Sequence, residues 1–247
     1  IARCDDAFLV HNGIIKSAMN LIDAERAELL YSRMGPALEA SGGSAGNTAA
    51  GVASLGGRAA YFGKVANDQL GEIFTHDIQA QGVHFETKPL ESQPPTARSM
   101  IFVTDDGERS MNTYLGACVE LGPDDVEPSV VADAAVTYFE GYLWDPPLAK
   151  DAIRECARIA HQHGREVAMT LSDSFCVHRY RAEFLDLMRS GTVDIVFANR
   201  AEALALYETE DFEHALSMIS KDCKLAAVTL SEEGSIWVSI DDYEGHY

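Results

Sequence analysis

Hydrophobic and polar positions follow two alternating rhythms along the chain. Short apolar runs predict strands at 58–65, 83–87, 136–139, 166–171, 194–198, 226–230 and 235–240. Apolar residues spaced three and four apart predict helices between them, at 48–55, 70–81, 147–163, 181–188, 201–207 and 212–219. Strands that alternate with helices are typical of βαβ units. The pattern therefore predicts an α/β fold built around a mostly parallel sheet.

Two segments interrupt this alternation. Strand-like runs on either side of Asp105-Asp106-Gly107 predict a β-hairpin. Apolar runs at 7–10 and 13–18, around Asn12-Gly13, predict two further short strands. We interpret these strands as a small β-sheet lid that excludes water from the chemistry, with the boundaries 7–20 and 95–116.

Composition narrows the class of protein. The 247 residues are 47% hydrophobic, which suits one large domain spanning 1–247. The formal charge of −20 repels phosphate backbones, so nucleic acid is not an expected partner. No apolar run approaches the length of a membrane span, and the five scattered cysteines contain no C-x-x-C pair. We expect a cytoplasmic protein with no membrane association.

A glycine-rich loop offers the first candidate binding site. Gly42, Gly43 and Gly46 surround a tight turn, and Asn47 stands where a helix of small apolar residues begins. Glycine allows a close approach of the backbone to a ligand, and a helix N-terminus presents free N–H groups. The loop predicts binding of a small hydroxylated or anionic ligand.

Two later strand ends offer further candidates. Asn199 and Glu202 follow the apolar strand at 194–198 and lie three residues apart, so they share one face of a first helical turn. They suit a Mg²⁺ ion held through its waters, or a simple capping box. Thr229 to Gly234 is a strand end that runs into a glycine turn, which suits a phosphate or adenine, or an ordinary hairpin connection.

These three segments together resemble the ribokinase-like (PfkB-type) family of sugar and nucleoside kinases. Gly42-Gly43-Ser44-Ala45-Gly46-Asn47, followed by Phe62-Gly63 and Asp68-Gln69-Leu70-Gly71, is similar to the family's N-terminal signature. Asn199-Arg200-Ala201-Glu202 matches its N-x-x-E motif, and Thr229 to Gly234 its nucleotide-binding turn. The lid segments look closest to adenosine-kinase-like members. The resemblance implies a three-layer α/β/α core with a small lid.

The resemblance also implies an activity: transfer of the γ-phosphoryl group of ATP to a hydroxyl of a sugar or nucleoside, with Mg²⁺. Gly42, Gly43 and Asn47 would bind the acceptor. The residues implied for ATP are Asn199, Thr229 and Gly234, and Glu202 would hold Mg²⁺ through water. Such catalysis is mostly positioning and electrostatic stabilisation. Some relatives pair through the lid, so a homodimer remains open.

The chain departs from the family pattern in two places. The family's catalytic aspartate lies in a G-A-G-D motif, which does not occur here, and Ser231 stands where many members have glycine. The chain begins at Ile1 and we expect it to be incomplete at both ends, with the catalytic residue outside it. Three hypotheses follow: an adenosine-kinase-like nucleoside kinase, a kinase of ribose, fructose or a keto-sugar acid, and a non-catalytic ligand-binding relative.

Overall fold

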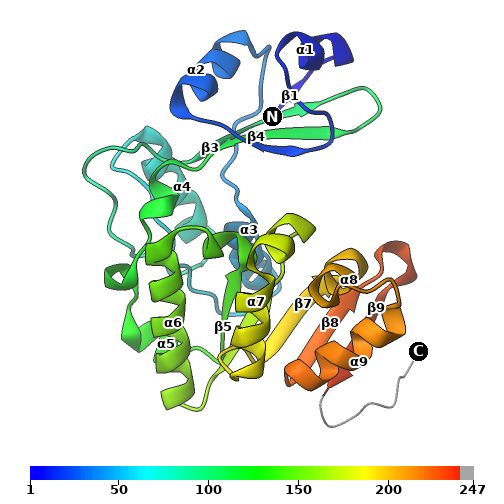
Figure 1. Cartoon of the computed structure of the whole chain (residues 1–247). Coiled ribbons are helices and arrows are strands. Elements are labelled where there is room, and N and C mark those ends of the chain that lie inside the picture. The colour runs from blue at the N-terminus through cyan, green and yellow to red at the C-terminus, as the bar shows by residue number, and fades with distance from the viewer. Residues whose placement is uncertain (240–247) are drawn as a thin grey trace. The chain divides into compact units, whose positions relative to one another are not determined.

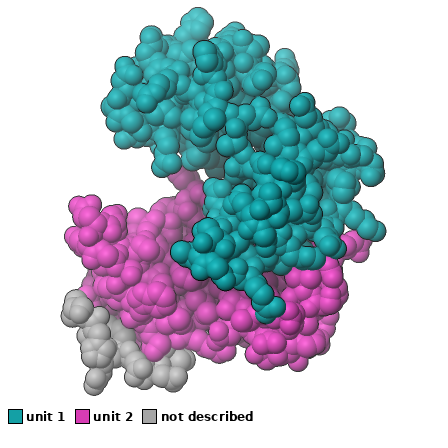
Figure 2. Space-filling view, turned by 180° about the vertical axis from the view of Figure 1, so that it is seen from behind, with its two compact units in different colours: residues 1–121 teal, residues 122–247 magenta. Residues whose placement is uncertain are grey.

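The computed structural model describes residues 1–239, which form helices and strands in two compact units (Figure 1). The units are Ile1–Leu121 and Gly122–Tyr247, coloured separately in Figure 2. The elements of the first are β1 (Ala2–Arg3), α1 (Asp6–His11), β2 (Met19–Leu21), α2 (Ala24–Arg33), α3 (Ser44–Ser54), α4 (Gln69–Ala80), β3 (Arg98–Val103) and β4 (Arg109–Tyr114). Those of the second are α5 (Pro128–Asp133), β5 (Val136–Glu140), α6 (Pro147–Gln162), β6 (Glu166–Thr170), α7 (Ser174–Arg189), β7 (Ile195–Asn199), α8 (Arg200–Tyr207), α9 (Phe212–Asp222), β8 (Leu225–Thr229) and β9 (Ser235–Ser239).

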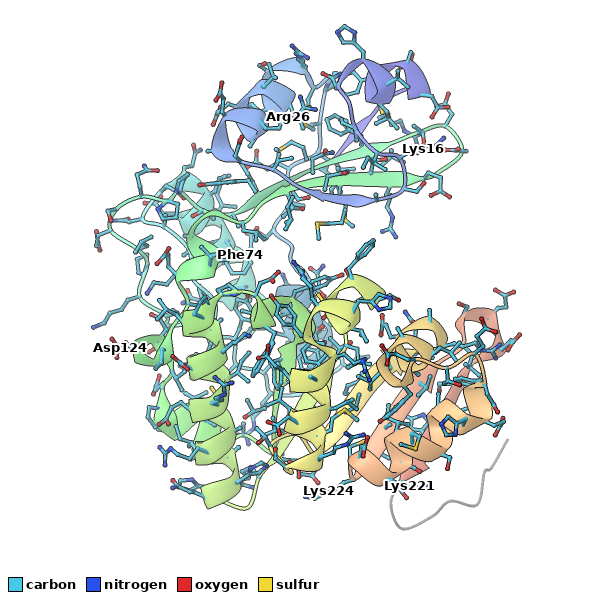
Figure 3. The ribbon with its side chains drawn as sticks, in the orientation of Figure 1. Lys16, Arg26, Phe74, Asp124, Lys221 and Lys224 are labelled. Atoms are coloured by element: carbon cyan, nitrogen blue, oxygen red, sulfur yellow. The ribbon has the colours of Figure 1, made fainter. Side chains whose placement is uncertain are left out.

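A four-stranded sheet in the first unit has the order β1-β3-β4-β2. The predicted hairpin is confirmed as antiparallel β3 and β4, and β1 and β2 flank it in parallel. One face of the sheet buries Met100 and Phe102 in a core with Leu9 and Leu30 from α1 and α2. Lys16 ties the chain before β2 to the hairpin turn, because its Nζ lies 2.6 Å from the Asp106 carboxylate (Figure 3). The small predicted sheet therefore exists, and its role as a lid stays a prediction.

The two strands predicted at 7–10 and 13–18 are wrong. Residues 6–11 form α1, because Asp5 accepts a hydrogen bond from the Phe8 N–H at 2.7 Å and so caps a helix. Asn12-Gly13, which predicts a turn between strands, instead ends this helix, with Gly13 at φ 59°. A six-residue helix spans too few turns to show a helical period, so its apolar residues resemble a short strand.

The strands predicted at 58–65 and 83–87 are also wrong as continuous strands. Residues 58–66 and 83–90 run in parallel but, within residues 1–239, pair only at isolated bridges, Ala60 with His84 and Ala66 with Leu90. Between these bridges the Tyr61 ring folds over Gly63, where an added Cβ would lie 2.4 Å from it. The predicted helix at 48–55 begins earlier, at Ser44, while the helix at 70–81 is confirmed within one residue as α4.

The start of α4 is fastened to the base of the hairpin. Asp68 caps α4 through the Gly71 N–H at 2.9 Å and also accepts hydrogen bonds from the Thr96 N–H at 2.8 Å and its hydroxyl at 2.7 Å. A Cβ on Gly71 would lie 2.0 Å from the Ala66 carbonyl oxygen, so only glycine fits. The Asp68-to-Gly71 part of the family signature therefore has a structural function in this chain.

The second unit contains a five-stranded sheet of order β5-β6-β7-β8-β9, parallel except for β9. Helices α6, α8 and α9 pack on the sheet, and α7 packs against α8 (Figure 1). Val196 and Val238 point to this covered face and are at most 5% exposed, whereas Phe197 and Trp237, on the other face, are 38% and 60% exposed. The predicted α/β class and the mostly parallel sheet are confirmed.

Most predicted elements of this unit are confirmed within about two residues. One exception is the helix predicted at 212–219, which ends three residues later, at Asp222. The larger exception is the helix predicted at 181–188, because α7 begins at Ser174 and has a non-helical residue, Tyr180, inside it. The Asp173 carboxylate caps the earlier start by accepting from the Cys176 N–H at 2.7 Å. Position 240 of the last predicted strand lies outside the described residues. Within residues 1–239, no helix combines the length and apolarity that crossing a membrane requires.

Candidate functional site

The two motifs at later strand ends lie side by side in the second unit. Strands β7 and β8 are parallel neighbours, and Asn199 is paired in register with Thr229. Each residue ends its strand, so both motifs emerge from the carboxyl edge of the sheet. This is the edge at which open α/β sheets bind their ligands.

Asn199 and Glu202 form a complete capping box at the start of α8. The Asn199 side-chain oxygen accepts from the Glu202 N–H at 2.9 Å, and Glu202 accepts from the Asn199 N–H at 3.0 Å and from its amide at 2.7 Å. The capping interpretation is therefore confirmed. Capping does not exclude ligand binding by Glu202. The residue is only 5% exposed, and a second negative charge acts on its carboxylate.

That further charge belongs to Asp173, which lies just beyond β6. Burial raises the pKa of Glu202, and the negative charge of Asp173 raises it further against the lowering effect of the Asn199 N–H. Asp173 also acts on the phenol of Tyr142, whose pKa is raised by burial and then by this charge. Three strand ends thus contribute polar groups to one edge.

The donor set at this edge fits a hard divalent cation. Carboxylate and amide oxygens are the ligands that Mg²⁺ takes, and a cation would relieve the repulsion between Glu202 and Asp173. Both oxygens of Glu202 already accept hydrogen bonds from Asn199. Contact through the ion's waters is therefore the arrangement that suits Glu202.

The turn after β8 combines two left-handed residues. Ser231 has φ 55° and Gly234 has φ 98°. The turn closes through the Leu230 N–H, which donates to the Gly234 carbonyl at 2.8 Å, and the Glu233 N–H, which donates to Leu230 at 3.1 Å. Ser231 therefore adopts the backbone conformation that glycine takes easily, at the position where many family members have glycine.

The glycine loop lies in the first unit, at the N-terminus of α3. Gly43 occupies the cap position with φ 95° and leaves the helix without a side-chain cap. Gly42, Gly43 and Asn47 are exposed, and the Asn47 amide makes no side-chain hydrogen bond within residues 1–239. The Ser41 hydroxyl donates to Asp77 of α4 at 2.6 Å, which fixes one end of the loop. The loop therefore presents open backbone and one amide to solvent.

Sequence reasoning missed several groups at the carboxyl edge of the sheet. Glu140 ends β5 and is 6% exposed, and Asp173 follows β6. Phe175, in the first turn of α7, is 81% exposed. Glu140 ends one predicted strand and Asp173 follows the next within three residues, so the strand ends were the available signal for these two carboxylates.

Comparison with known proteins agrees with this arrangement. Residues 18–247 match the model of the pfkB family of carbohydrate kinases. An adenosine kinase structure from Sinorhizobium meliloti is 83% identical, with TM-score 0.91, over 98% of this chain and 74% of that one. A probable sugar kinase protein from Rhizobium etli CFN 42 is 77% identical, with TM-score 0.93, over 100% of this chain and 74% of that one.

A more distant relative is the probable fructokinase-2 of Arabidopsis thaliana, 26% identical over an alignment 223 residues long that covers 83% of this chain and 64% of that protein. The chain thus spans less than two thirds of the length of this relative. The family model nevertheless matches residues 18–247, which are most of the chain, and this match identifies the protein family. The chain belongs to the pfkB family of carbohydrate kinases, and its fold is ribokinase-like, as the motifs predict.

Proposed function

We propose that the protein is an ATP-dependent phosphotransferase that moves the γ-phosphoryl group to a hydroxyl of a nucleoside or sugar. The observation that carries the proposal is the pairing of Asn199 with Thr229 at one sheet edge, beside the buried Glu202 carboxylate. A buried carboxylate with a raised pKa beside a like charge is a recognised mark of a functional site. Family membership supports the same reaction class.

The side chains divide into two groups of roles. Asn199, Thr229 and Gly234 bind ATP, and Glu202 with Asp173 holds Mg²⁺ through its waters. Bound Mg²⁺ neutralises negative charge on the phosphates. Gly42, Gly43 and Asn47 bind hydroxyl groups of the acceptor through N–H groups and the free amide. No residue of this chain is assigned as the base that takes the hydroxyl proton.

A nucleoside acceptor is favoured over a plain sugar. The closely similar Sinorhizobium meliloti protein is described as an adenosine kinase, which supports this choice, while the Rhizobium etli protein is described as a probable sugar kinase.

Phosphoryl transfer assays test the proposal. The full-length protein is incubated with Mg·ATP and a panel of adenosine, other nucleosides, ribose and fructose. We expect the highest kcat/KM for a nucleoside, in line with the closely similar protein described as an adenosine kinase. A preference for ribose or fructose would establish the sugar-kinase alternative. If nothing is phosphorylated but a ligand binds, the non-catalytic relative is the better description.

The small sheet of the first unit remains a proposed lid or pairing surface in a cytoplasmic enzyme. Its uncovered face carries Met19, Leu21 and Met111, which are 40%, 52% and 37% exposed. Apolar groups on an open sheet face suit either closure over a ligand or contact with a second copy. Sedimentation of the wild-type protein and of a Leu21→Lys variant distinguishes the lid from the pairing surface. If the sheet pairs two copies, the wild-type protein sediments as a dimer and the variant as a monomer. If the sheet is a lid, the two proteins sediment alike.

A further inference from the structure

Arg200 connects the two nucleotide motifs through its side chain. It is the first residue of α8, directly after Asn199, and its guanidinium donates to the Glu233 carboxylate at 3.0 Å. The same guanidinium lies 4.8 Å from the centre of the Phe212 ring at the start of α9. One side chain therefore touches the β8–β9 turn and the first residue of α9 while its backbone belongs to α8.

The turn that Glu233 belongs to needs such support. Residues 231–234 are all exposed, so no buried side chain of these residues anchors the turn. Ser231 holds a left-handed conformation that costs a non-glycine residue free energy. Within residues 1–239, the Arg200–Glu233 pair is the side-chain bond that joins this turn to the N-x-x-E motif.

We propose that Arg200 is a positioning residue for the nucleotide: its ion pair with Glu233 holds the turn at 230–234 in the shape that binds ATP. The proposal rests on the nucleotide edge of the proposed function. Exposed ion pairs contribute little to overall stability. The expected effect of this pair is therefore on ATP affinity rather than on folding. The stacking on Phe212 reduces the freedom of the guanidinium and favours one geometry.

Calorimetric titration with a non-hydrolysable ATP analogue and Mg²⁺ tests the proposal. Arg200→Ala and Glu233→Gln should each weaken binding by about fivefold, the effect of losing one exposed pair of about 1 kcal/mol. The double variant should bind no more weakly than either single variant, because both remove the same contact. Arg200→Lys should recover part of the affinity. Acceptor KM and the unfolding temperature should stay at wild-type values.

A matched control uses an ion pair of the same kind at the other end of α8. Arg181 lies 2.7 Å from Glu208, with side chains 36% and 66% exposed, compared with 50% and 65% for Arg200 and Glu233. Arg181→Ala should leave ATP affinity unchanged. An equal loss in Arg181→Ala, or additive losses in the Arg200 and Glu233 variants, would overturn the proposal. A wild-type protein that binds no ATP would instead contradict the proposed function, and this inference with it.

Discussion

The two edges of the five-stranded sheet bury carboxylates in opposite electrostatic settings. At the amino edge, Asp194 is 4% exposed and lies 2.7 Å from Lys224 and 2.8 Å from His161 (Lys224 is labelled in Figure 3). It also accepts a hydrogen bond from the Val167 N–H at 2.9 Å. At the carboxyl edge, Glu202 is equally buried, but its charged neighbour is Asp173. One carboxylate is neutralised and the other is not.

The pKa values express this difference. Burial alone would raise the pKa of Asp194, but Lys224, His161 and Val167 outweigh it and the pKa is lowered. Burial raises the pKa of Glu202, and among the described residues no cation acts on this carboxylate to reverse the shift. A buried carboxylate that is paired with cations, such as Asp194, holds neighbouring strands together. A buried carboxylate beside a like charge, such as Glu202, lowers the stability of the fold, and a cationic ligand would relieve this repulsion. We therefore expect the amino edge to stabilise the fold and propose the carboxyl edge as the ligand-binding edge.

Asp194→Asn should have the largest effect on stability. The substitution removes the charge that pairs with Lys224 and His161 while leaving an oxygen for the Val167 N–H. Breaking a buried ion pair is expected to cost about 3 kcal/mol of unfolding free energy. Urea unfolding measures the loss, and Lys224→Ala, at an end of the pair that is 63% exposed, should cost less. A change below about 1 kcal/mol for Asp194→Asn would contradict a structural role for this edge.

Glu202→Gln should show the reverse balance. Removing its charge relieves repulsion from Asp173, so the unfolding free energy should change by less than about 1 kcal/mol. Affinity for Mg·ATP should fall by about tenfold, because a charge-assisted contact to the hydrated ion is lost. Separate equilibrium titrations with Mg·ATP and with the acceptor measure the affinity of the protein for each ligand. Asn199→Ala should likewise weaken the binding of Mg·ATP more than the binding of the acceptor. An equal loss of affinity for both ligands would contradict the assignment of Asn199 and Glu202 to the nucleotide.

The pH dependence of stability should also differ in sign between the two edges. The stability that Asp194 contributes is present above its unfolded pKa of about 3.9 and disappears as pH falls through its lower folded pKa. Glu202 binds its proton more tightly in the folded state, so its contribution declines as pH rises from about 4.3 through its raised pKa. The urea midpoints of wild type and Asp194→Asn should therefore differ most near pH 7 and approach each other as the pH is lowered to 3. Those for Glu202→Gln should rise relative to wild type with increasing pH.

The contrast between the two sheet edges also shows which residues of the candidate site can be predicted from the sequence. Asn199 and Thr229 are predicted because each lies at the end of an apolar strand, and Glu202 because it lies three residues after Asn199; parallel strands end at one edge. Asp173 is missed because α7 begins with Ser, Phe, Cys, Val and His, which show no helical period, so its cap is not recognised. Asp194 is missed because its partners come from 161 and 224, and sequence spacing does not report contacts between such distant residues.

The fold is predictable to a similar degree and for similar reasons. The second unit is predicted well because its strands and most of its helices are long enough to show a period. In the first unit, α1 is six residues long and the segments near Ala60 and His84 pair only at single bridges. Local side-chain events, such as the Asp5 cap and the Tyr61 ring over Gly63, decide these elements. Hydrophobic periodicity carries no information on such contacts.

The smallest predicted effect concerns the turn at the proposed ligand-binding edge. Ser231→Gly removes the cost of a left-handed non-glycine residue, about 1 kcal/mol, but adds the larger unfolded-state entropy of glycine, about 0.5 kcal/mol. A net gain of about 0.5 kcal/mol in unfolding free energy is expected, measurable by urea unfolding. The turn should then hold its shape with less help, so Arg200→Ala should weaken ATP binding less in the Ser231→Gly background than in wild type. An unchanged dependence on Arg200 would show that the ion pair acts on the nucleotide by a route other than the shape of this turn.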